Sequence, residues 1–249
     1  MFWSKWKKLS VMRKRYIVKL IGRCVIFVAC VLAVLFGSPQ LDILQGMAFF
    51  ERFSVLHLLW LLWIADMAEQ LFPVKKEIPL GSQKLFHLRF RPVRERLDRQ
   101  AIRRYIVTTT KSAYRVMVLW GALLLALGLL HGYGVIGDRA LFLVSTAFYV
   151  CDLICVLIWC PFRLMMNTRC CTTCRIFNWD HLMMFTPMMF VKGFFSQSLV
   201  LISIAVWLVW ELFVLLYPER FWDGSNEALK CSSCTDKLCT QYCRKLRQK

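Results

Sequence analysis

Long apolar runs, separated by short polar or basic segments, dominate this chain. Five of these runs approach the roughly 20 residues that a helix needs to cross the hydrocarbon core of a bilayer. Each is read as a helix, because hydrocarbon offers no partners to unpaired backbone groups, and no ten-residue alternation indicates a β-barrel. The pattern predicts an all-α, polytopic membrane helix bundle. The five predicted spans are Tyr16–Phe36, Phe53–Phe72, Val116–His131, Ala140–Cys160 and Phe194–Tyr217.

A sixth crossing is expected between Ile176 and the last of these spans. The stretch FNWDHLMMFTPMMFVKGFF is apolar enough for a short span bent at Pro187. The alternative is a re-entrant segment at 177–193 with five full spans, which would need protein or water around its irregular backbone. Six spans put both termini on one side of the membrane, whereas five put them on opposite sides.

Lysine and arginine are distributed unevenly around the spans. Residues 1–23 carry eight and residues 73–114 carry eleven, whereas the links before the second and fourth spans carry one each, Arg52 and Arg139. Positive residues accumulate on the cytoplasmic side of membrane proteins. The N-terminus and the basic 73–114 loop are therefore expected in the cytoplasm, and the links outside it.

The C-terminal tail decides between the two topologies. Residues 218–249 carry seven lysines and arginines, which favours six spans with both termini cytoplasmic in a bacterial inner membrane. The cysteine loop at 160–180 then faces the cytoplasm as well. The chain divides into a transmembrane helical domain, residues 1–217, and a cysteine-rich tail.

The formal net charge of +18 also bears on partners. The excess lies beside apolar spans, where positive-inside topology and anionic lipid headgroups account for it, and no nucleic-acid reader motif accompanies it. Nucleic acid is therefore not an expected partner. Within the basic loop, residues 82–113 are expected to form an amphipathic helix at the membrane surface, or alternatively a solvated charged connector.

Twelve cysteines fall into groups inside and outside the spans. Cys24, Cys30, Cys151 and Cys155 lie within predicted spans and are expected to act as small buried apolar residues. The other eight lie at span ends or beyond, where two C-x2-C pairs can point sulfurs at one metal ion. The predicted ligands are Cys171, Cys174, Cys231 and Cys234, followed by Cys239 and Cys243, and then by Cys160 and Cys170.

The environment and density of these thiols favour a metal site over disulfides. Disulfides rarely persist in a reducing cytoplasm, and thiolates suit either an iron–sulfur cluster or zinc. Iron–sulfur is the preferred cofactor, with zinc, redox thiols or unliganded thiols as alternatives. The expected function is electron transfer or redox chemistry, which implies a redox partner protein. The alternative is a transport or assembly protein with structural zinc.

Three stretches near the cysteines carry a family resemblance: CCTTCRIFNWDHLMMFTP, YPERFWDGSNEALKCSSC and KLC. Together they resemble an uncharacterised family of cysteine-rich bacterial integral membrane proteins. The resemblance covers about residues 160–240. It implies a cysteine-rich membrane protein and no particular activity.

Ionisable residues at membrane depth supply the remaining candidates. Asp152 and Glu211 lie inside predicted spans, where an ionised group is costly unless it faces a partner or water. Asp180 and His181 follow the cysteine loop, where an aspartate can orient a histidine beside a metal or can cap a helix. These four are the candidate catalytic residues, with no reaction assigned to them.

Overall fold

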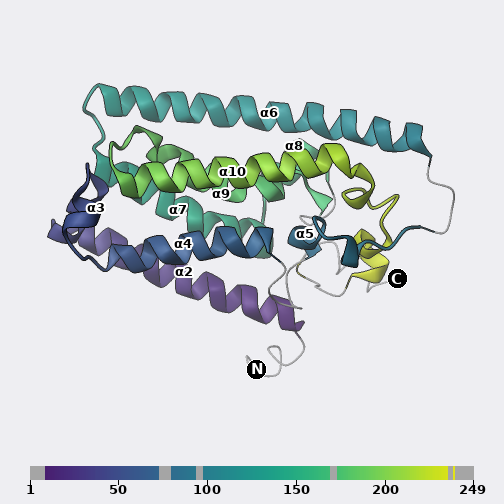
Figure 1. The fold of residues 1–249 in the computed structure, drawn as a ribbon, viewed down its shortest axis with the longest axis horizontal. Helices are drawn as coiled ribbons and strands as arrows, with labels where there is room; N and C mark the ends of the chain where they lie inside the picture. The colour runs from purple at the N-terminus through teal and green to yellow at the C-terminus, as the bar shows by residue number, and fades with distance from the viewer. Residues whose placement is uncertain (1–8, 73–79, 94–97, 169–172, 235–237, 239–249) are drawn as a thin grey trace.

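Long helices run side by side along one axis and form most of the structure (Figure 1). The structure is a computed structural model that describes residues 9–72, 80–93, 98–168, 173–234 and 238. The long helices are α2 (Val11–Leu35), α4 (Leu56–Leu71), α6 (Arg99–Gly132), α7 (Asp138–Leu157) and α10 (Phe194–Leu216).

Short elements connect or cap the long helices. The short α-helices are α3 (Ala48–Glu51), α5 (Leu80–Gln83), α8 (Phe162–Met166) and α9 (Asp180–Phe185). The 3-10 helices are η1 (Pro39–Leu44), η2 (His87–Arg89), η4 (Ile176–Trp179), η5 (Thr186–Phe190), η6 (Pro218–Arg220), η7 (Glu227–Leu229) and η8 (Cys231–Ser233).

Within the described part of the chain, four helices are long and apolar enough to cross a membrane: α2, α6, α7 and α10. Helix α4 has 16 residues, which cover about 24 Å at 1.5 Å per residue and fall short of a hydrocarbon core of about 30 Å. The predicted membrane helix bundle agrees with this architecture. The number of spans stays a prediction.

The outer surface of the bundle is apolar in the way that a lipid-facing surface requires. Along α2 only Arg23 and Cys30 are buried, while Val18, Val25 and Leu32 are each about half exposed or more. Soluble proteins rarely expose continuous apolar surface of this extent. The exposed side of α2 therefore supports a membrane location.

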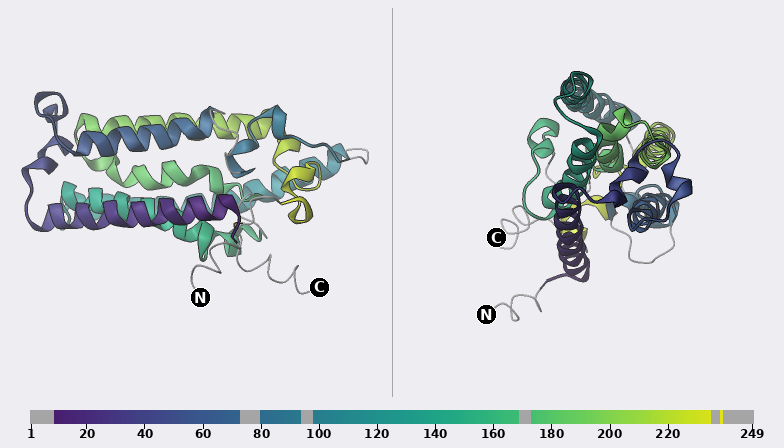
Figure 2. Two further views of the ribbon diagram at one scale, coloured as in Figure 1. Left: turned by 90° about the horizontal axis from the view of Figure 1, so that it is seen from below. Right: turned by 90° about the vertical axis from the view of Figure 1, so that its left-hand side faces the viewer.

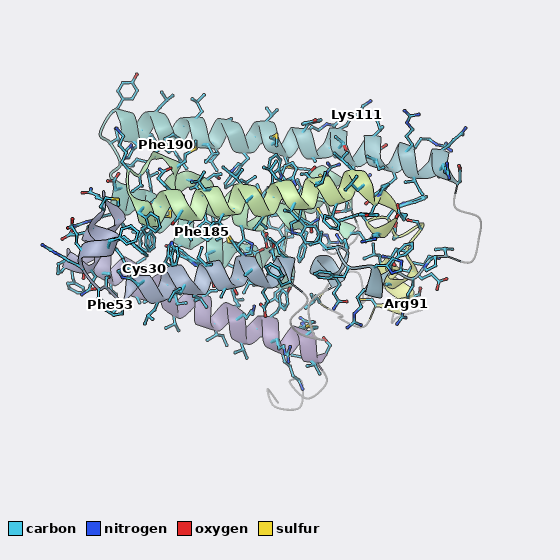
Figure 3. All side chains as sticks on the ribbon, viewed as in Figure 1. Cys30, Phe53, Arg91, Lys111, Phe185 and Phe190 are labelled. Carbon is cyan, nitrogen blue, oxygen red and sulfur yellow. The ribbon has the colours of Figure 1, made fainter. Side chains whose placement is uncertain are left out.

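The two ends of the bundle collect different segments of the chain. Helices α4, α7 and α10 end where α2 and α6 begin, and we call this the basic end (Figures 1 and 2). The links at 36–55, 133–137 and 191–193 lie at the opposite end, which we call the far end. Figure 3 places Arg91 toward the basic end and Phe53 at the far end.

The segment from η4 to η5 connects the basic end with the far end through the interior of the bundle. Near the basic end, Gln70 of α4 donates a hydrogen bond to Asp180 at 2.8 Å. At the far end, Gly46 donates to the carbonyl of Lys192 at 2.8 Å and accepts from Phe194 at 3.1 Å. The predicted bend at Pro187 coincides with the change from α9 to η5, which has proline in its first turn.

Helix α6 differs from the expectation for the basic loop. The predicted surface helix at 82–113 was wrong in its bounds, because residues 99–115 are the first half of one continuous 34-residue helix. No glycine or proline interrupts the sequence from Arg99 to Trp120, and Asp98 caps the start by accepting from the Gln100 amide at 2.8 Å. The basic part of α6 is thus coaxial with its apolar part.

The C-terminal segment packs against the basic loop. Tyr105 of α6 donates to the Phe221 carbonyl at 3.1 Å, and Arg220 donates to the Leu85 carbonyl at 2.8 Å. An isolated antiparallel bridge joins Pro92 to Asn226. Residues 218–234 therefore lie at the basic end, next to the described part of the loop.

Aromatic side chains fill the centre of the bundle. The Trp63 ring lies 5.1 Å from Phe185, 5.8 Å from Tyr149 and 6.2 Å from Phe195, measured between ring centroids. These contacts bring α4, α7, α9 and α10 together, with Phe185 near the middle of the bundle in Figure 3. The core holds α9 in place, and α9 carries two of the candidate residues.

Candidate functional site: a thiol cavity at the basic end

A cavity of about 240 Å³ lies between the end of α7, α8, η4 and α9. We call it the thiol cavity, because four cysteines line it. Its other walls are mostly apolar or aromatic, with carboxylates from α7 and α9. The residues that define it here are Cys151, Cys155, Cys160, Cys174, Asp152, Asp180, Trp120, Phe148, Phe162, Phe177, Met183 and Met184.

Helix α7 supplies two of the four cysteines. Cys151 and Cys155 are one helical turn apart, and Cys155 lies in the last turn of the helix. The expectation of plain buried residues was wrong for Cys151, which is exposed, and also for Cys24. It holds for Cys30, which is buried far from this cavity on α2. Sequence reasoning therefore set aside two thiols that the structure brings to the site.

The other two thiols come from predicted ligands. Cys160 follows α7 and lines the cavity beside Cys155, with which its side chain interacts. Cys174 is only 3% exposed. Burial raises the pKa of the Cys174 thiol above the usual range. The structure thus places two predicted ligands, Cys160 and Cys174, on one cavity.

The remaining predicted ligands are placed elsewhere or lie outside the described residues. Cys231 is the first residue of η8 and Cys234 is its C-cap, and both lie at the basic end and are partly exposed. Among the described residues, no group of three or more histidine, cysteine, aspartate or glutamate side chains is arranged to hold a metal ion. The predicted ligands outside the described residues are Cys170, Cys171, Cys239 and Cys243.

A buried ion cluster lies behind the cavity wall and centres on Arg23 of α2. Its guanidinium donates to Asp152 at 2.8 Å and to the Tyr149 carbonyl at 2.7 Å, and lies 3.5 Å from Asp66. The same guanidinium stacks over the Tyr149 ring at 3.8 Å, and the Tyr149 hydroxyl donates to Asp66 at 2.9 Å. Two carboxylates from α4 and α7 therefore share one arginine from a third helix.

The cluster reaches the surface of the bundle through a lysine. Lys19, one turn before Arg23 on α2, lies 3.5 Å from Asp66 and 3.2 Å from Glu69. The side chain of Lys19 is about half exposed, whereas that of Arg23 is 8% exposed. The charges thus run from the exposed side of α2 inward to Asp152 at the cavity wall.

Asp180, which lines the same cavity, forms a second polar group with His181 behind it. The Asp180 carboxylate accepts from the His181 amide at 2.8 Å and lies 3.1 Å from Nδ1 of the same histidine. Asp180 is the first residue of α9 and does not act as its N-cap, which is Trp179. The Asp180 carboxylate lies beside the His181 ring, and its role in orienting that ring next to a metal stays a prediction. His181 is 3% exposed, and its Nε2 has no hydrogen-bond partner among the described residues.

Glu211 has a structural partner and does not line the thiol cavity. It forms an ion pair with Arg175 and accepts from the Trp179 indole at 2.8 Å. Arg175 also contacts Thr110 of α6, so the pair joins α6, η4 and α10. A carboxylate held in this way fixes the loop after Cys174 against two long helices.

Sequence reasoning missed the role of Arg23. It was counted among the eight positive residues at the N-terminus, although it lies inside an apolar helix. Opposite charges within the spans could have predicted this contact. Arg23, Asp66 and Asp152 lie at membrane depth in three different predicted spans. Groups of opposite charge within a bilayer tend to pair.

Comparison of the chain with protein-family models, with curated proteins and with solved structures finds no match. The site's geometry is therefore the basis for any functional inference. The family resemblance over residues 160–240 remains an expectation.

Proposed function

We propose that the protein is a multi-pass membrane protein whose thiol site serves electron transfer or redox chemistry at the cytoplasmic face. The observation that carries the proposal is the cavity lined by Cys151, Cys155, Cys160 and Cys174. Four thiols from three consecutive segments meet there, next to Asp152 of the buried ion cluster. Cysteines grouped in a reducing compartment more often bind metal or take part in redox chemistry than form structural disulfides.

The arrangement of the chain supports the six-span topology. The described tail packs against the basic loop, as the Pro92–Asn226 bridge illustrates, and the segment from η4 to η5 links the two ends of the bundle. An even number of crossings would put the tail, the basic loop and the thiol cavity on one side. Under the positive-inside rule that side is the cytoplasm of a bacterial inner membrane.

Anionic lipids are the proposed surroundings of the basic end. The first half of α6 carries arginines and lysines beside the apolar half of the same helix. A basic segment next to a span gains roughly 1 kcal/mol per charge from an anionic membrane surface. The residues concerned are Arg99, Arg103, Arg104, Lys111 and Arg115.

An iron–sulfur cluster is the proposed cofactor, with a redox partner protein to exchange electrons with it. Its proposed ligands are Cys160, Cys174, Cys231 and Cys234 together with Cys170, Cys171, Cys239 and Cys243. The four members among the described residues are not arranged as one metal-binding group, so the proposal rests on sequence density and on their shared location at the basic end. The alternative, a transport or assembly protein with structural zinc, lacks support from Glu211, which is tied to Arg175.

Purification without oxygen, followed by iron, zinc and sulfide analysis and a visible absorption spectrum, tests this cofactor. We expect coloured protein with iron, and loss of iron in Cys174→Ser but not in the control Cys24→Ser. Stoichiometric zinc without iron would remove the redox role of the metal. Colourless protein without either metal, whose eight span-end thiols can all be alkylated, would refute both metal proposals.

A further inference from the structure

Two cysteines of the cavity lie close to each other in the chain and line the same space. Cys155 lies in the last turn of α7 and Cys160 follows three residues after the helix ends at Leu157. Both thiols line the thiol cavity, and the side chains of the two residues interact. Such proximity is what a disulfide between these residues requires.

The location of this pair speaks against a permanent disulfide. If the basic end is cytoplasmic, a stable disulfide would be reduced there, whereas cytoplasmic disulfides that do form are usually transient and catalytic or sensing. A pair of neighbouring cysteines at such a site is suited to alternate between dithiol and disulfide. That alternation needs a partner that accepts two electrons.

The walls of the cavity select the chemical class of that partner. Trp120 and Phe148 contact each other with ring centroids 5.0 Å apart, and Phe162 and Phe177 complete an aromatic lining. A charged or peptide-like oxidant would have to be desolvated to enter this apolar cavity, which is unfavourable. A flat apolar ring that moves from the lipid into the cavity loses no hydration, and it exchanges contacts with lipid chains for contacts with aromatic side chains.

Access and size agree with a ring that arrives from the bilayer. Ile158 and Trp159, between the two cysteines, are each more than half exposed on the outer surface of the bundle. A cavity of about 240 Å³ is smaller than the roughly 300–1,000 Å³ of drug-sized ligand sites. It suits one ring, with any long tail remaining in the lipid.

We propose that Cys155 and Cys160 form a dithiol–disulfide couple whose oxidant is a lipid-soluble quinone bound in the thiol cavity. Two S–H bonds break and one S–S bond forms. The two electrons and two protons pass to the quinone, which becomes the hydroquinone, so atoms and charge balance without water. The proposal rests on redox use of the cavity, as proposed above, but not on a metal. It pairs Cys160 with Cys155 instead of using Cys160 as a metal ligand.

The couple can be tested directly in detergent-solubilised full-length protein. Reduced protein, freed of reductant under anoxic conditions, is mixed with a benzoquinone substituted at all four ring positions, to which thiols cannot add. We expect one quinone consumed per protein, measured by absorbance, and two thiols lost. Differential alkylation with peptide mass spectrometry should locate both at Cys155 and Cys160.

Matched variants separate this pair from its neighbours. Cys155→Ser and Cys160→Ser should each reduce quinone consumption at least tenfold, whereas Cys151→Ser, one turn away on the same cavity, should retain it. Mass spectrometry of the unaltered protein identifies the oxidised cysteines even if a variant does not fold. Oxidation of Cys151 with Cys155, or quinone consumption unchanged in Cys160→Ser, would overturn the proposal.

The same preparation distinguishes this proposal from the cofactor proposal. Metal-free protein that still forms the Cys155–Cys160 disulfide would remove the iron–sulfur cluster and leave the dithiol couple in place. Iron-containing protein in which quinone oxidises no thiol at either position would leave the cluster and remove the couple.

Discussion

The two ends of the bundle hold the helices together by different means. At the basic end, charged side chains from three helices meet inside the protein, with the Arg23 side chain 8% exposed. At the far end, the corresponding charged pair joins Asp42 to Arg139 at 3.5 Å, with both side chains about half exposed. The interior of the far end relies instead on backbone contact between Gly46 and Gly193 and on aromatic packing around Phe49.

This difference indicates which end has a function beyond stability. Burying ions costs several kcal/mol per ion before pairing repays it, and apolar packing can hold helices together without that cost. The far end is held by aromatic packing and backbone contacts, which do not require buried ions. The basic end keeps its ions next to the thiol cavity, and Asp152 belongs to both.

The largest expected contrast between the ends is their side of the membrane. Tyr133 at the far end is 82% exposed, so a membrane-impermeant maleimide should label Tyr133→Cys in intact cells. Arg104→Cys, in the basic half of α6, should be labelled only after the membrane is permeabilised. Labelling of Arg104→Cys or of Cys234 in intact cells would contradict the six-span topology.

The next largest effect is expected from Arg23→Leu. The substitution leaves Asp66 and Asp152 buried without their shared cation, which typically costs about 3–5 kcal/mol. Thermal unfolding in detergent, followed by gel-filtration fluorescence, measures the loss. The matched control at the far end is Arg139→Leu, whose exposed pair should contribute within about 1 kcal/mol. Equal losses in the two variants would remove the contrast between the ends.

The sequence predicted the helices well, because their signal is local. Each of the five spans corresponds to a long helix, and the aromatic and aliphatic runs that predict them need no knowledge of their neighbours. The predicted bounds differ most from the observed ones for α6. The polar residues from Arg99 onward were not assigned to the span, but they belong to the same continuous helix. Helix propensity and an aspartate cap explain this difference after the fact.

The thiol cavity was predicted only in part, because it depends on which faces of the helices meet. Cys160 and Cys174 were expected to belong together on the basis of density in the sequence. Cys151 and Cys155 lie inside an apolar run, and nothing in that run shows that they face the loop after α7. The partnership of Arg23 with Asp152 spans 129 residues and is equally invisible to local patterns.

A third, smaller effect is expected at the far end from Gly193→Ala. A Cβ at this position would overlap the carbonyl of Leu44, and backbone cannot move aside as a flexible side chain can. Overpacking of this kind typically costs about 1–3 kcal/mol. Gly22→Ala, with no neighbouring atom within 4 Å, is the control and should be neutral or slightly stabilising. Loss of stability without any change in thiol oxidation would confirm that the far end is structural.

The smallest expected effect concerns the first turn of α6 at the basic end. Asp98 accepts from the Gln100 amide, so Asp98→Ala should destabilise that turn by about 1 kcal/mol, whereas Asp98→Asn retains the cap. The side chain is more than half exposed, and its pair with Arg104 at 3.8 Å is long, so the charge itself should contribute little. Hydrogen exchange at the amides of Gln100 to Arg103 measures the change.

Faster exchange in the alanine variant alone identifies the cap as the cause. Equal acceleration in both variants would instead assign the effect to charge, and would make the start of α6 a second place at the basic end where ions hold the helix.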